Sequence, residues 1–337
     1  MIEIDGSLGE GGGQVLRTSL ALSILTRQPV HLYNIRAGRK KPGLQPQHLR
    51  SVQAAAAICA AEVRGAALNS RELFFQPGEA TPGRYQFDIG TAGSTSLVLQ
   101  TIYLPLSLAG GRSHLTITGG THVPHSPCYH YLERQWLPYL GKIGLDIDLA
   151  MEQAGFYPRG GGRIRATIRP AGMLAPLDLV RRGELLRLTG ISAVANLDPD
   201  IARRQKHQAL RRLEPRFPET KIKTLDLPSP VKGTFLSLLA EFEHSQCFTF
   251  ALGEPGKRAE RVADEAVDAL EAFLATDGAV DPYLADQLLL PLSPGALHAC
   301  EHPKSPRICS PTRRSCACSH RLRLRSRERS GRRGESG

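Results

Sequence analysis

Apolar residues follow helical and strand spacing through the first 292 residues, and two stretches show the same order of elements. In each, a Gly-rich turn leads into an apolar-periodic helix, a strand, a polar loop, a second helix and a pair of strands. In the first stretch these elements are expected at 4–6, 15–25, 30–35, 47–58 and 72–76. In the second they are expected at 88–90, 97–108, 114–118, 130–143, 145–151 and 163–169. The pattern predicts a βαβαββ unit that occurs twice, about 80 residues apart.

A chance ordering within an ordinary α+β domain is the alternative explanation of this match. We favour duplication because the turn, both helices, the strand and the polar loop all recur in the same order. Residues 181–256 interrupt the pattern with strands near 185–191, 236–242 and 247–252 and a basic helix over 199–213. The sequence therefore predicts a small α/β domain inserted into a larger one.

The earlier pattern resumes with a helix over 259–274. Residues 257–292 resemble the opening of a third unit, which residues 293–337 cut short. The predicted fold is therefore α+β, made of repeated βαβαββ units. Residues 1–180 form the first two repeats of a large domain, residues 181–256 form the inserted small α/β domain, and the third repeat is truncated.

The basic charge of the chain is concentrated near its end. Eleven of the 43 Lys and Arg and three of the 32 Asp and Glu fall in residues 301–337, so the net charge of +11 divides into +8 there and +3 over residues 1–300. Residues 298–337 contain no Phe, Tyr, Trp or Val. Four of the seven cysteines also crowd this segment: Cys300, Cys309, Cys316 and Cys318. The basic total therefore does not by itself indicate a nucleic-acid-binding domain.

Three interpretations of this basic, Cys/Arg/Ser-rich tail stay open. A frameshifted terminus is the preferred one, because a GC-rich gene read out of register gives such a mixture of Arg, Ser, Cys and Pro. A solvated basic tail that binds RNA is the second. The third is a zinc site at Cys309, Cys316, Cys318 and His320, although that spacing matches no common zinc module.

The sequence contains no segment suited to a membrane or to secretion. It has no run of eighteen apolar residues, and Met1–Asp5 includes acids rather than the basic and apolar regions of a signal peptide. The remaining cysteines, Cys59, Cys128 and Cys247, are scattered, as in proteins whose thiols stay reduced. We therefore expect a cytoplasmic protein without a membrane partner.

Two segments of the first unit have features of a phosphate-binding site. Gly11–Gly13 opens the first helix, where backbone amides and the helix dipole favour an anion. Tight helix–strand packing explains these glycines equally well, and the Gly-Lys-Ser/Thr of a P-loop is missing. Further along, a cationic loop leads into the second helix: Arg36, Arg39, Lys40, Lys41, Gln47 and His48. Guanidinium groups suit paired phosphate contacts, so this loop predicts phosphate or RNA binding, with a solvated loop as the alternative.

Two weaker signals concern a glycine run and a pair of acids. Gly160–Gly162 follows Arg159, and is either a hairpin turn or a place where Arg159 and backbone amides meet a nucleic-acid backbone. Glu10 and Asp286 lie beside segments expected to meet phosphate, so they could hold a divalent cation. Spacing alone does not decide either case.

Taken together, these motifs resemble those of the RNA 3′-terminal phosphate cyclase family, in its branch of true cyclases. The matching segments follow one another along residues 1–292: Gly9–Gln14 with Arg17, Arg36–Gly43 with Gln47 and His48, Thr91–Gln100, Gly119–Thr121, Gly155–Gly162 and Tyr283–Gln287. The resemblance implies three repeats of a unit with two helices and a four-stranded sheet, and a small inserted α/β domain. That organisation agrees with the repeat and the interruption in the apolar pattern.

The resemblance implies an ATP-dependent ligase that converts an RNA 3′-terminal phosphate into a 2′,3′-cyclic phosphodiester with Mg²⁺ or Mn²⁺. In such an enzyme a histidine accepts AMP from ATP, the RNA phosphate takes over the AMP, and the neighbouring 2′-hydroxyl displaces it. Covalent catalysis of this kind divides one difficult displacement into easier steps. The implied partner is RNA with a 3′-terminal phosphate, and the oligomeric state stays open.

The resemblance also implies which residues meet each substrate. The residues implied for ATP are Gln100, Tyr283, Leu284, Ala285, Asp286 and Gln287. Those implied for the metal ion are Glu10 and Asp286. Those implied for catalysis at the phosphates are Glu10, Arg17, Arg36, Arg39, Gln47 and His48. The segment Gly253–Gly256 is implied to close over the nucleotide, with Phe248 or Phe250 offering an apolar face.

One family feature is missing from this sequence. The AMP-accepting histidine of the family lies in a His-x-x-Thr-Asn-type motif about 25 residues after the tyrosine of Tyr283–Gln287, which falls near Ile308. No such motif occurs in the tail, and His298, His302 and His320 lack its flanking residues. The sequence therefore predicts a cyclase by descent whose tail has removed the nucleophile.

Two other functions remain as alternatives. The first is a non-catalytic RNA-processing or ribosome-assembly protein of the same fold. Gln100 and Tyr283–Gln287 argue against it, since a protein that only binds RNA has little need of an ATP site. The second is a carboxyvinyl transferase of similar repeated architecture, which fits less well because the Arg36–His48 and Tyr283–Gln287 segments match the cyclases.

Overall fold

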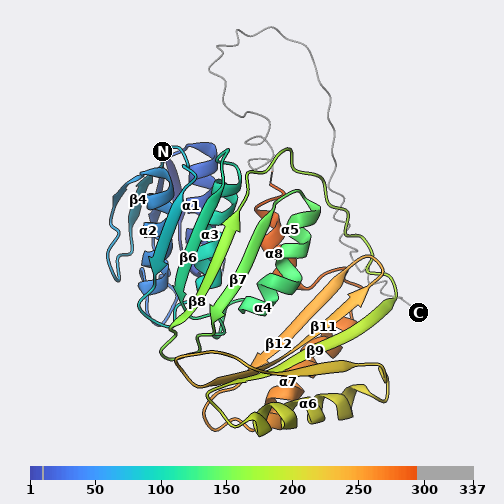
Figure 1. Ribbon diagram of the computed structural model, residues 1–337. Helices are drawn as coiled ribbons and strands as arrows, with labels where there is room; N and C mark the ends of the chain where they lie inside the picture. The colour runs from blue at the N-terminus through green and yellow to red at the C-terminus, as the bar shows by residue number, and fades with distance from the viewer. Residues whose placement is uncertain (10, 294–337) are drawn as a thin grey trace, which may run out of the picture. The chain divides into compact units, whose positions relative to one another are not determined.

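The described part of the chain contains three four-stranded sheets, each of which combines parallel and antiparallel pairs. The computed structural model describes residues 1–9 and 11–293, and it has the α+β class that the sequence predicts (Figure 1). No helix in this described part of the chain is long and apolar enough to span a bilayer.

The two repeated units have the same topology. The elements of the first are β1 (Ile2–Asp5), α1 (Gly13–Thr26), β2 (Val30–Tyr33), α2 (Pro46–Cys59), β3 (Glu62–Arg64) and β4 (Leu73–Gln76). Those of the second are β5 (Arg84–Asp88), α3 (Thr95–Ser107), β6 (Ser113–Gly119), α4 (Tyr129–Tyr131), the π-helix η1 (Leu132–Trp136), α5 (Leu137–Lys142), β7 (Ile147–Gln153) and β8 (Gly162–Ile168). The strand orders are β1-β2-β4-β3 and β5-β6-β8-β7, so the predicted βαβαββ repeat is confirmed.

The helices α1, α2 and α3 pack on one another and share one apolar core with both sheets. The helix α3 lies at the centre of this core. Every one of its thirteen residues is buried except Gln100, so the helix is apolar on nearly all sides. Its amino end is capped by Ser94, whose hydroxyl accepts from the amide of Leu97 at 3.4 Å. A partly exposed glutamine on such a helix marks the place where the core opens.

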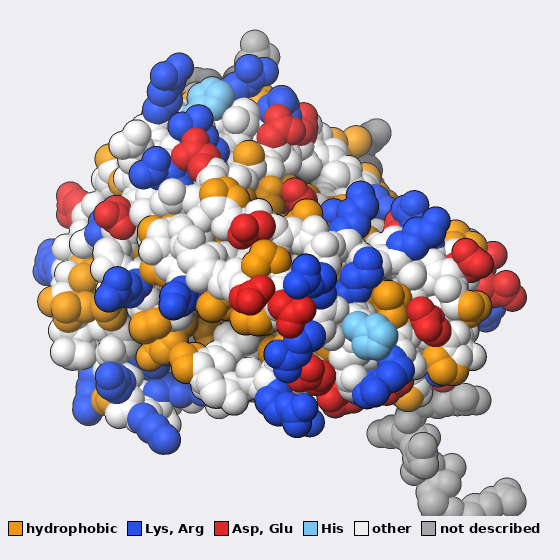
Figure 2. Space-filling model, turned by 60° about the horizontal axis from the view of Figure 1, so that its bottom comes forward, with side chains coloured by type: hydrophobic (Ala, Val, Ile, Leu, Met, Phe, Trp, Pro, Cys, Tyr) orange, Lys and Arg blue, Asp and Glu red, His pale blue; other side chains and the backbone are white. Residues whose placement is uncertain are grey.

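The third sheet has a different strand order, β10-β9-β11-β12, and is therefore not another copy of the repeat. Its elements are β9 (Leu185–Ala195), α6 (Pro199–Leu213), β10 (Lys221–Asp226), β11 (Gly233–Phe242) and β12 (Gln246–Leu252), and they are followed by α7 (Ala259–Leu274). The end of the molecule that carries α6 and α7 comes forward in Figure 2, where Lys and Arg side chains are interspersed with Asp and Glu. This face is therefore not a patch of one charge sign.

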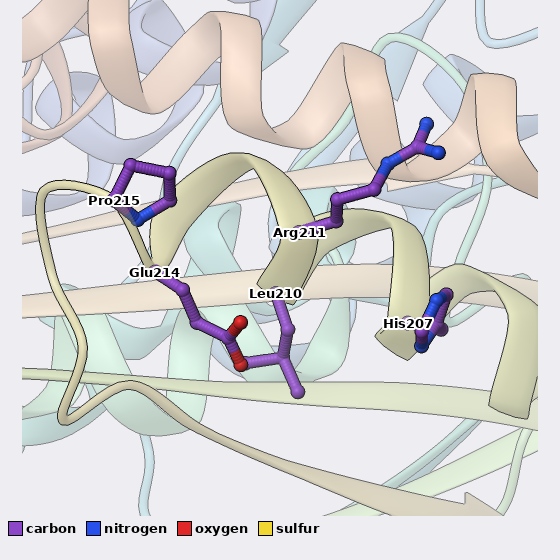
Figure 3. Close-up of a pocket in the computed structure, with 5 residues that line it drawn as sticks. All are labelled: His207, Leu210, Arg211, Glu214 and Pro215. Carbon is purple, nitrogen blue, oxygen red and sulfur yellow. The ribbon is translucent and has the colours of Figure 1, made fainter.

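The outer side of α6 borders a pocket of about 600 Å³ (Figure 3). Its lining comes from the second half of α6 and the turn that follows: His207, Leu210, Arg211, Glu214 and Pro215. None of the residues predicted to meet a substrate lines it.

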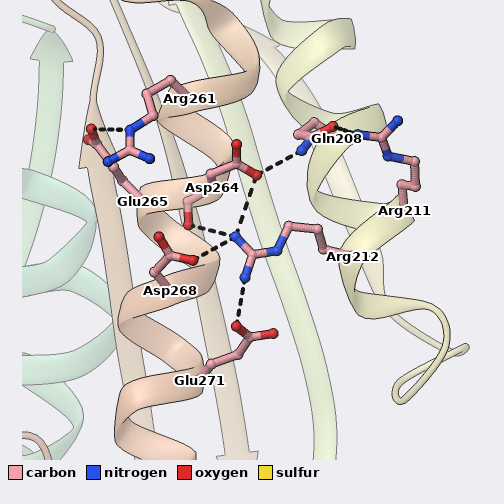
Figure 4. A network of polar contacts seen from close by, with 8 residues as sticks. All are labelled: Gln208, Arg211, Arg212, Arg261, Asp264, Glu265, Asp268 and Glu271. Carbon is pink, nitrogen blue, oxygen red and sulfur yellow. Dashed lines mark hydrogen bonds and ion pairs between the residues drawn. The ribbon is translucent and has the colours of Figure 1, made fainter.

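The helix α7 packs against the third sheet rather than beginning a third repeat. Val262, Ala266 and Leu270 are buried in one cluster with residues of α6, β11 and β12. Ion pairs also join α6 to α7, because Arg212 donates to Asp268 and Glu271, at 2.6 Å each (Figure 4). The domain boundary predicted after residue 256 assigns α7 to the large domain, whereas α7 packs on the third sheet. The sequence does not decide between the two, because an apolar helical stripe does not reveal which sheet it faces.

The last described helix, α8 (Pro282–Leu289), returns to the large core. Leu284 and Leu288 are buried there, and the capping Asp281 accepts from the amide of Leu284 at 3.0 Å. The predictions about the basic tail, its cysteines and its histidines fall in residues 294–337, which lie outside the described residues. The same holds for the truncation of the third repeat.

Candidate functional site

Three of the predicted residues converge on the first turn of α1, and we call Arg17, Arg39 and His48 the cation cluster. A β-carbon placed on Gly13 would lie 2.4 Å from Nε2 of His48 and 2.7 Å from Nη1 of Arg17. One placed on Gly12 would lie 3.3 Å from Nη2 of Arg39. The first turn of α1 contains no acidic side chain. Glycine therefore lets basic side chains approach the first turn of α1 closely, beside the free amides of the helix start, which is the chemistry of an anion site.

His48 is a neutral donor within this cluster. The amide of Gln45 donates to Nδ1 of His48 at 3.2 Å. Because an amide nitrogen can only donate, Nδ1 has no proton and Nε2 of the neutral ring carries it. Burial lowers the pKa of His48 to about 3, and the positive charges of Arg36 and Arg17 add to this effect. At neutral pH the ring therefore presents an uncharged N–H group to the space at Gly13.

Arg17 connects the cluster to α8. Burial lowers the pKa of Arg17 to about 10, while the charge of Asp286 acts in the opposite direction, so the guanidinium stays a cation at neutral pH. Asp286 accepts a hydrogen bond from Nε2 of Gln14 at 2.5 Å. Gln14 and Arg17, one helical turn apart on α1, thus both interact with the carboxylate of Asp286 on α8. The two helices lie far apart in the sequence.

Arg36 and Gln47 make structural bonds that sequence reasoning missed. Nη1 of Arg36 donates to the carbonyls of Lys41, at 2.7 Å, and Gly43, at 3.1 Å, which folds the cationic loop on itself. Oε1 of Gln47 accepts from the amide of Ser94 at 2.9 Å, and so joins α2 to the start of α3. Burial, with the charge of Arg39, lowers the pKa of Arg36. Both residues position the loops of the two repeats as well as bordering the cluster.

A cavity of about 980 Å³ lies between the large core, β12, α7 and α8. Its lining includes five of the predicted residues: Arg17, Gln100, Tyr283, Asp286 and Gln287. Phe248 and Phe250 also line it, as the predicted apolar face requires. Because Arg17 both lines the cavity and faces Gly13, the cavity and the cation cluster are contiguous.

Other predicted residues lie elsewhere. Leu284 is fully buried in the large core and Ala285 is exposed, and neither lines the cavity. This follows from helical geometry, because successive residues of Tyr283–Gln287 point to different sides of α8. The segment Gly253–Gly256 does not line the cavity either. Glu10 and the expected nucleophile position near Ile308 lie outside the described residues.

Four buried polar atoms in the cavity wall make no hydrogen bond to the described residues. They are Nε2 of Gln100, the hydroxyl of Tyr103, Nε1 of Trp136 and Oε1 of Gln287. A buried polar group without a partner costs about 1–3 kcal/mol, and such groups are rare in folded proteins. Their residues all line this cavity, so unsatisfied donors and acceptors are concentrated in its wall. Tyr103 and Trp136 were not predicted as site residues, because aromatic side chains in such a sequence are typical of an ordinary apolar core.

Aromatic rings form another part of this wall. The ring of Tyr131 lies 5.9 Å from that of Phe248 and 6.5 Å from that of Phe250. Together with the polar atoms opposite them, these rings suit a flat heteroaromatic group with a polar edge.

The orientation of α8 depends on a network that the sequence did not reveal. Asp281 accepts from the hydroxyl of Tyr131 at 3.2 Å and from Nε2 of Gln135 at 2.9 Å. The same Nε2 of Gln135 donates to the carbonyl of Gln246 in β12 at 3.0 Å. Burial raises the pKa of Asp281 in spite of these donors. The π-helix η1 thus ties α8 to the third sheet, and π-helical turns often occur at functional sites.

Comparisons with known proteins find relatives of one family along most of the chain. The family profile of the RNA 3′-terminal phosphate cyclases matches residues 8–307. An RNA 3′-terminal phosphate cyclase from Nostoc punctiforme is 45% identical over 298 residues, which cover 86% of each chain. One from Ralstonia nicotianae is 46% identical over 295 residues, covering 87% of this chain and 84% of the relative. One from Archaeoglobus fulgidus is 44% identical over 289 residues, covering 86% of each.

Replacement of Asp281 is expected to loosen α8. In Asp281→Asn the new amide group meets Gln135, whose own amide cannot turn around without losing its bond to Gln246. We expect a loss of about 1–3 kcal/mol in the free energy of unfolding, measured in urea, and faster hydrogen exchange of the α8 amides. Asp277→Asn, at an exposed position nearby, is the matched control. Unchanged exchange in α8 would show that the network does not position this helix.

His48 is expected to make stability depend on pH. Its folded pKa of about 3 lies below the ordinary value of 6.5, so between these values the unfolded chain binds a proton that the folded chain does not. The stabilisation is complete above pH 6.5 and is lost as the pH falls toward 3. From pH 7 to 5 the wild type should therefore lose about 2 kcal/mol more unfolding free energy than His48→Gln. The exposed His207→Gln is the control, and equal losses in all three proteins would show that His48 is not held neutral.

Proposed function

The chain belongs to the RNA 3′-terminal phosphate cyclase family, and on this premise we propose that its sites are those of an enzyme that uses ATP to convert the 3′-terminal phosphate of an RNA into a 2′,3′-cyclic phosphodiester. The chain itself lacks the histidine motif that accepts AMP in such an enzyme. The observation that carries the proposal is the position of Arg17, which faces both the glycine-lined space at α1 and the large cavity. The two substrates of such a reaction must bring their phosphates together, and contiguous sites allow this.

The cation cluster is the proposed site of the RNA terminal phosphate. Arg17 and Arg39 offer guanidinium donors, and His48 offers a neutral N–H group with a fixed direction. Charge-assisted hydrogen bonds of this kind are stronger than neutral ones, and they stabilise negative charge that develops on a phosphoryl group. Because Gly12 and Gly13 leave the helix amides accessible, an oxyanion can also bind the backbone there.

The cavity is the proposed site of ATP. The rings of Phe248, Phe250 and Tyr131 provide the apolar contact that a base requires. The unpaired Nε2 of Gln100 and Oε1 of Gln287 supply one donor and one acceptor for polar groups of the nucleotide. ATP would then place its phosphates toward Arg17, where the cavity meets the cluster.

The described residues fit a magnesium ion only in part. They include no group of three or more His, Cys, Asp or Glu that could hold a metal ion. Mg²⁺ is commonly bound by one or two carboxylates together with substrate phosphates, so Asp286 fits as one ligand, and Glu10 is the second residue predicted from the sequence. In that position a bound cation would neutralise phosphate charge.

One sequence observation favours a second function, that of an RNA-binding protein without catalysis. The His-x-x-Thr-Asn-type motif expected near Ile308 does not occur in residues 294–337. The ATP-side features of the cavity favour the cyclase, while the missing motif favours the binding protein. The cytoplasm remains the proposed compartment, and it suits the buried free thiols Cys59, Cys128 and Cys247.

The glycine at position 13 provides a direct test of phosphate binding. Gly13→Ala adds a methyl group that collides with Arg17 and with His48, whose ring is held in place by Gln45, and so displaces them without demanding a left-handed backbone. We expect its affinity for a 3′-phosphorylated RNA oligonucleotide, measured by fluorescence anisotropy, to fall about ten- to a hundredfold. Gly38→Ala is the control, because no atom lies within 4 Å of its added β-carbon. Equal affinities in the two variants would remove the terminal phosphate from this space.

Adenylylation distinguishes the two functions. The full chain is incubated with Mg²⁺ and ATP labelled at the α-phosphate, and label that stays on the denatured protein is measured. We expect none, because the histidine motif is missing, and an acid-labile adduct once a C-terminus with that motif replaces residues 293–337. Label on the chain as it stands would show that another residue accepts AMP. No label on either protein would favour the binding function.

A further inference from the structure

A short loop projects from the junction between the second repeat and the third sheet. The amide of Gly160 donates to the carbonyl of Phe156 at 2.8 Å and closes Tyr157–Arg159 into a tight turn. Phe156 is buried, and its ring lies 5.2 Å from that of His122. The base of the loop is therefore held by the core, and only its tip faces solvent.

The tip carries an aromatic and a cationic side chain that have no partner among the described residues. Tyr157 is 69% exposed, and Arg159 is exposed as well. Neither side chain makes a hydrogen bond, an ion pair or a ring contact with a residue that the structure describes. A single exposed aromatic residue is common on protein surfaces and needs no explanation by itself. The surroundings of this one favour a function.

The loop adjoins the elements that hold the cation cluster. A β-carbon on Gly160 would lie 2.7 Å from the carbonyl oxygen of Thr91, so the loop rests on the turn before α3. A β-carbon on Gly93, in the same turn, would lie 3.0 Å from Cβ of Gln47. Gln47 precedes His48 in α2. The turn before α3 thus lies between the loop and the proposed site of the terminal phosphate.

A second cation borders the loop from the third sheet. A β-carbon on Gly161 would lie 2.8 Å from Cγ of Pro230, and one on Gly233 would overlap the ring of Phe156. Lys232 lies between these two contacts, is exposed, and forms no ion pair with a described residue. The segment that carries Lys232 therefore contacts the base of the loop that carries Tyr157 and Arg159.

Rings flanked by cations are the usual means of binding single-stranded nucleic acids, because bases stack on the ring while the cations meet the backbone. We propose that Tyr157, Arg159 and Lys232 bind the RNA strand on the 5′ side of its terminal phosphate. Tyr157 stacks on a base, and the two cations contact backbone phosphates. The inference rests on the proposed function, and it makes the preferred substrate an RNA whose 3′ end is single-stranded, since a paired base cannot stack on the loop.

Ion pairing distinguishes the cations of the basic helix α6 from those beside the loop. There Arg204 pairs with Glu260 and Arg212 pairs with Asp268, both in contact with α7. Ion pairs of this kind occupy the donors that an RNA backbone would need. Arg159 and Lys232 form no such pair with any residue in 1–9 or 11–293.

The test uses the full chain and two probes that report on different parts of the site. One is a labelled 3′-phosphorylated single-stranded RNA of about ten nucleotides, bound in fluorescence anisotropy, and the other is adenosine 3′-phosphate as a competitor. Tyr157→Ala is expected to weaken RNA binding about five- to a hundredfold, the range of one stacked base, and to leave the competitor's affinity unchanged. Tyr157→Trp keeps a ring and should keep the affinity.

Salt dependence tests the two cations separately. For single strands each phosphate contact contributes about 0.7 to the slope of log affinity against log salt concentration, so Arg159→Ala and Lys232→Ala should each lower the slope by about that amount. Tyr157→Ala should leave the slope unchanged. Met173→Ala, beyond the other end of β8, and Arg64→Ala, on β3, remove exposed side chains elsewhere and serve as controls.

The outcomes separate the loop from the site it adjoins. If Tyr157→Ala binds the RNA as the wild type does while both probes still bind, the loop inference is wrong and the proposed function stands. Equal affinity for a blunt duplex with the same 3′-phosphate would also overturn the inference. If the wild type binds neither probe, the proposed function fails and the loop inference fails with it. Loss of RNA binding alone in Tyr157→Ala, with an unchanged melting temperature, supports the inference.

Discussion

The positive charge of Arg17, held at the start of α1, is the constraint on which the site depends. Removing a guanidinium from water is costly, and here the charge of Asp286 on α8 offsets only part of the cost, because burial still lowers the pKa of Arg17. Neutral His48 adds no further positive charge, because burial keeps its pKa near 3. An anion bound at Gly13 would neutralise the remaining positive charge. The residues whose positive charge is costly in the free protein therefore favour a phosphate ligand.

The repeated fold brings the parts of this balance together. Each repeat leads from its first strand into a helix, and the start of α3 in the second repeat is joined to α2 of the first, because the amide of Ser94 donates to Gln47. The next residue of α2, His48, contacts Gly13 at the start of α1. Gln100 then emerges from the otherwise buried α3 into the cavity. The site is therefore a consequence of packing two copies of one unit side by side, with loops on the same edge.

The third sheet contributes the other wall of the cavity and is joined to the large core by few, specific bonds. Gln135 reaches both Asp281 and β12, so one side chain sets α8 and the sheet relative to each other. A change in that side chain would alter the width of the cavity without removing any residue that lines it. The Tyr157 loop lies at this same junction, between Thr91 and Pro230, so a bound RNA strand would contact both parts of the protein.

The sequence by itself determined the repeat, the α+β class and the family, because apolar periodicity and ordered glycine and arginine motifs are local properties of the chain. It also named the three residues of the cluster and a minority of those that line the cavity. Packing decided the rest. Four features depend on contacts between residues far apart in the chain. The helix α7 covers the third sheet, Leu284 faces the core, Asp281 orients α8, and the Tyr157 loop lies beside the proposed phosphate site. No local pattern encodes such contacts, because the same apolar stripe, acid or exposed ring is compatible with many partners until the whole chain has folded.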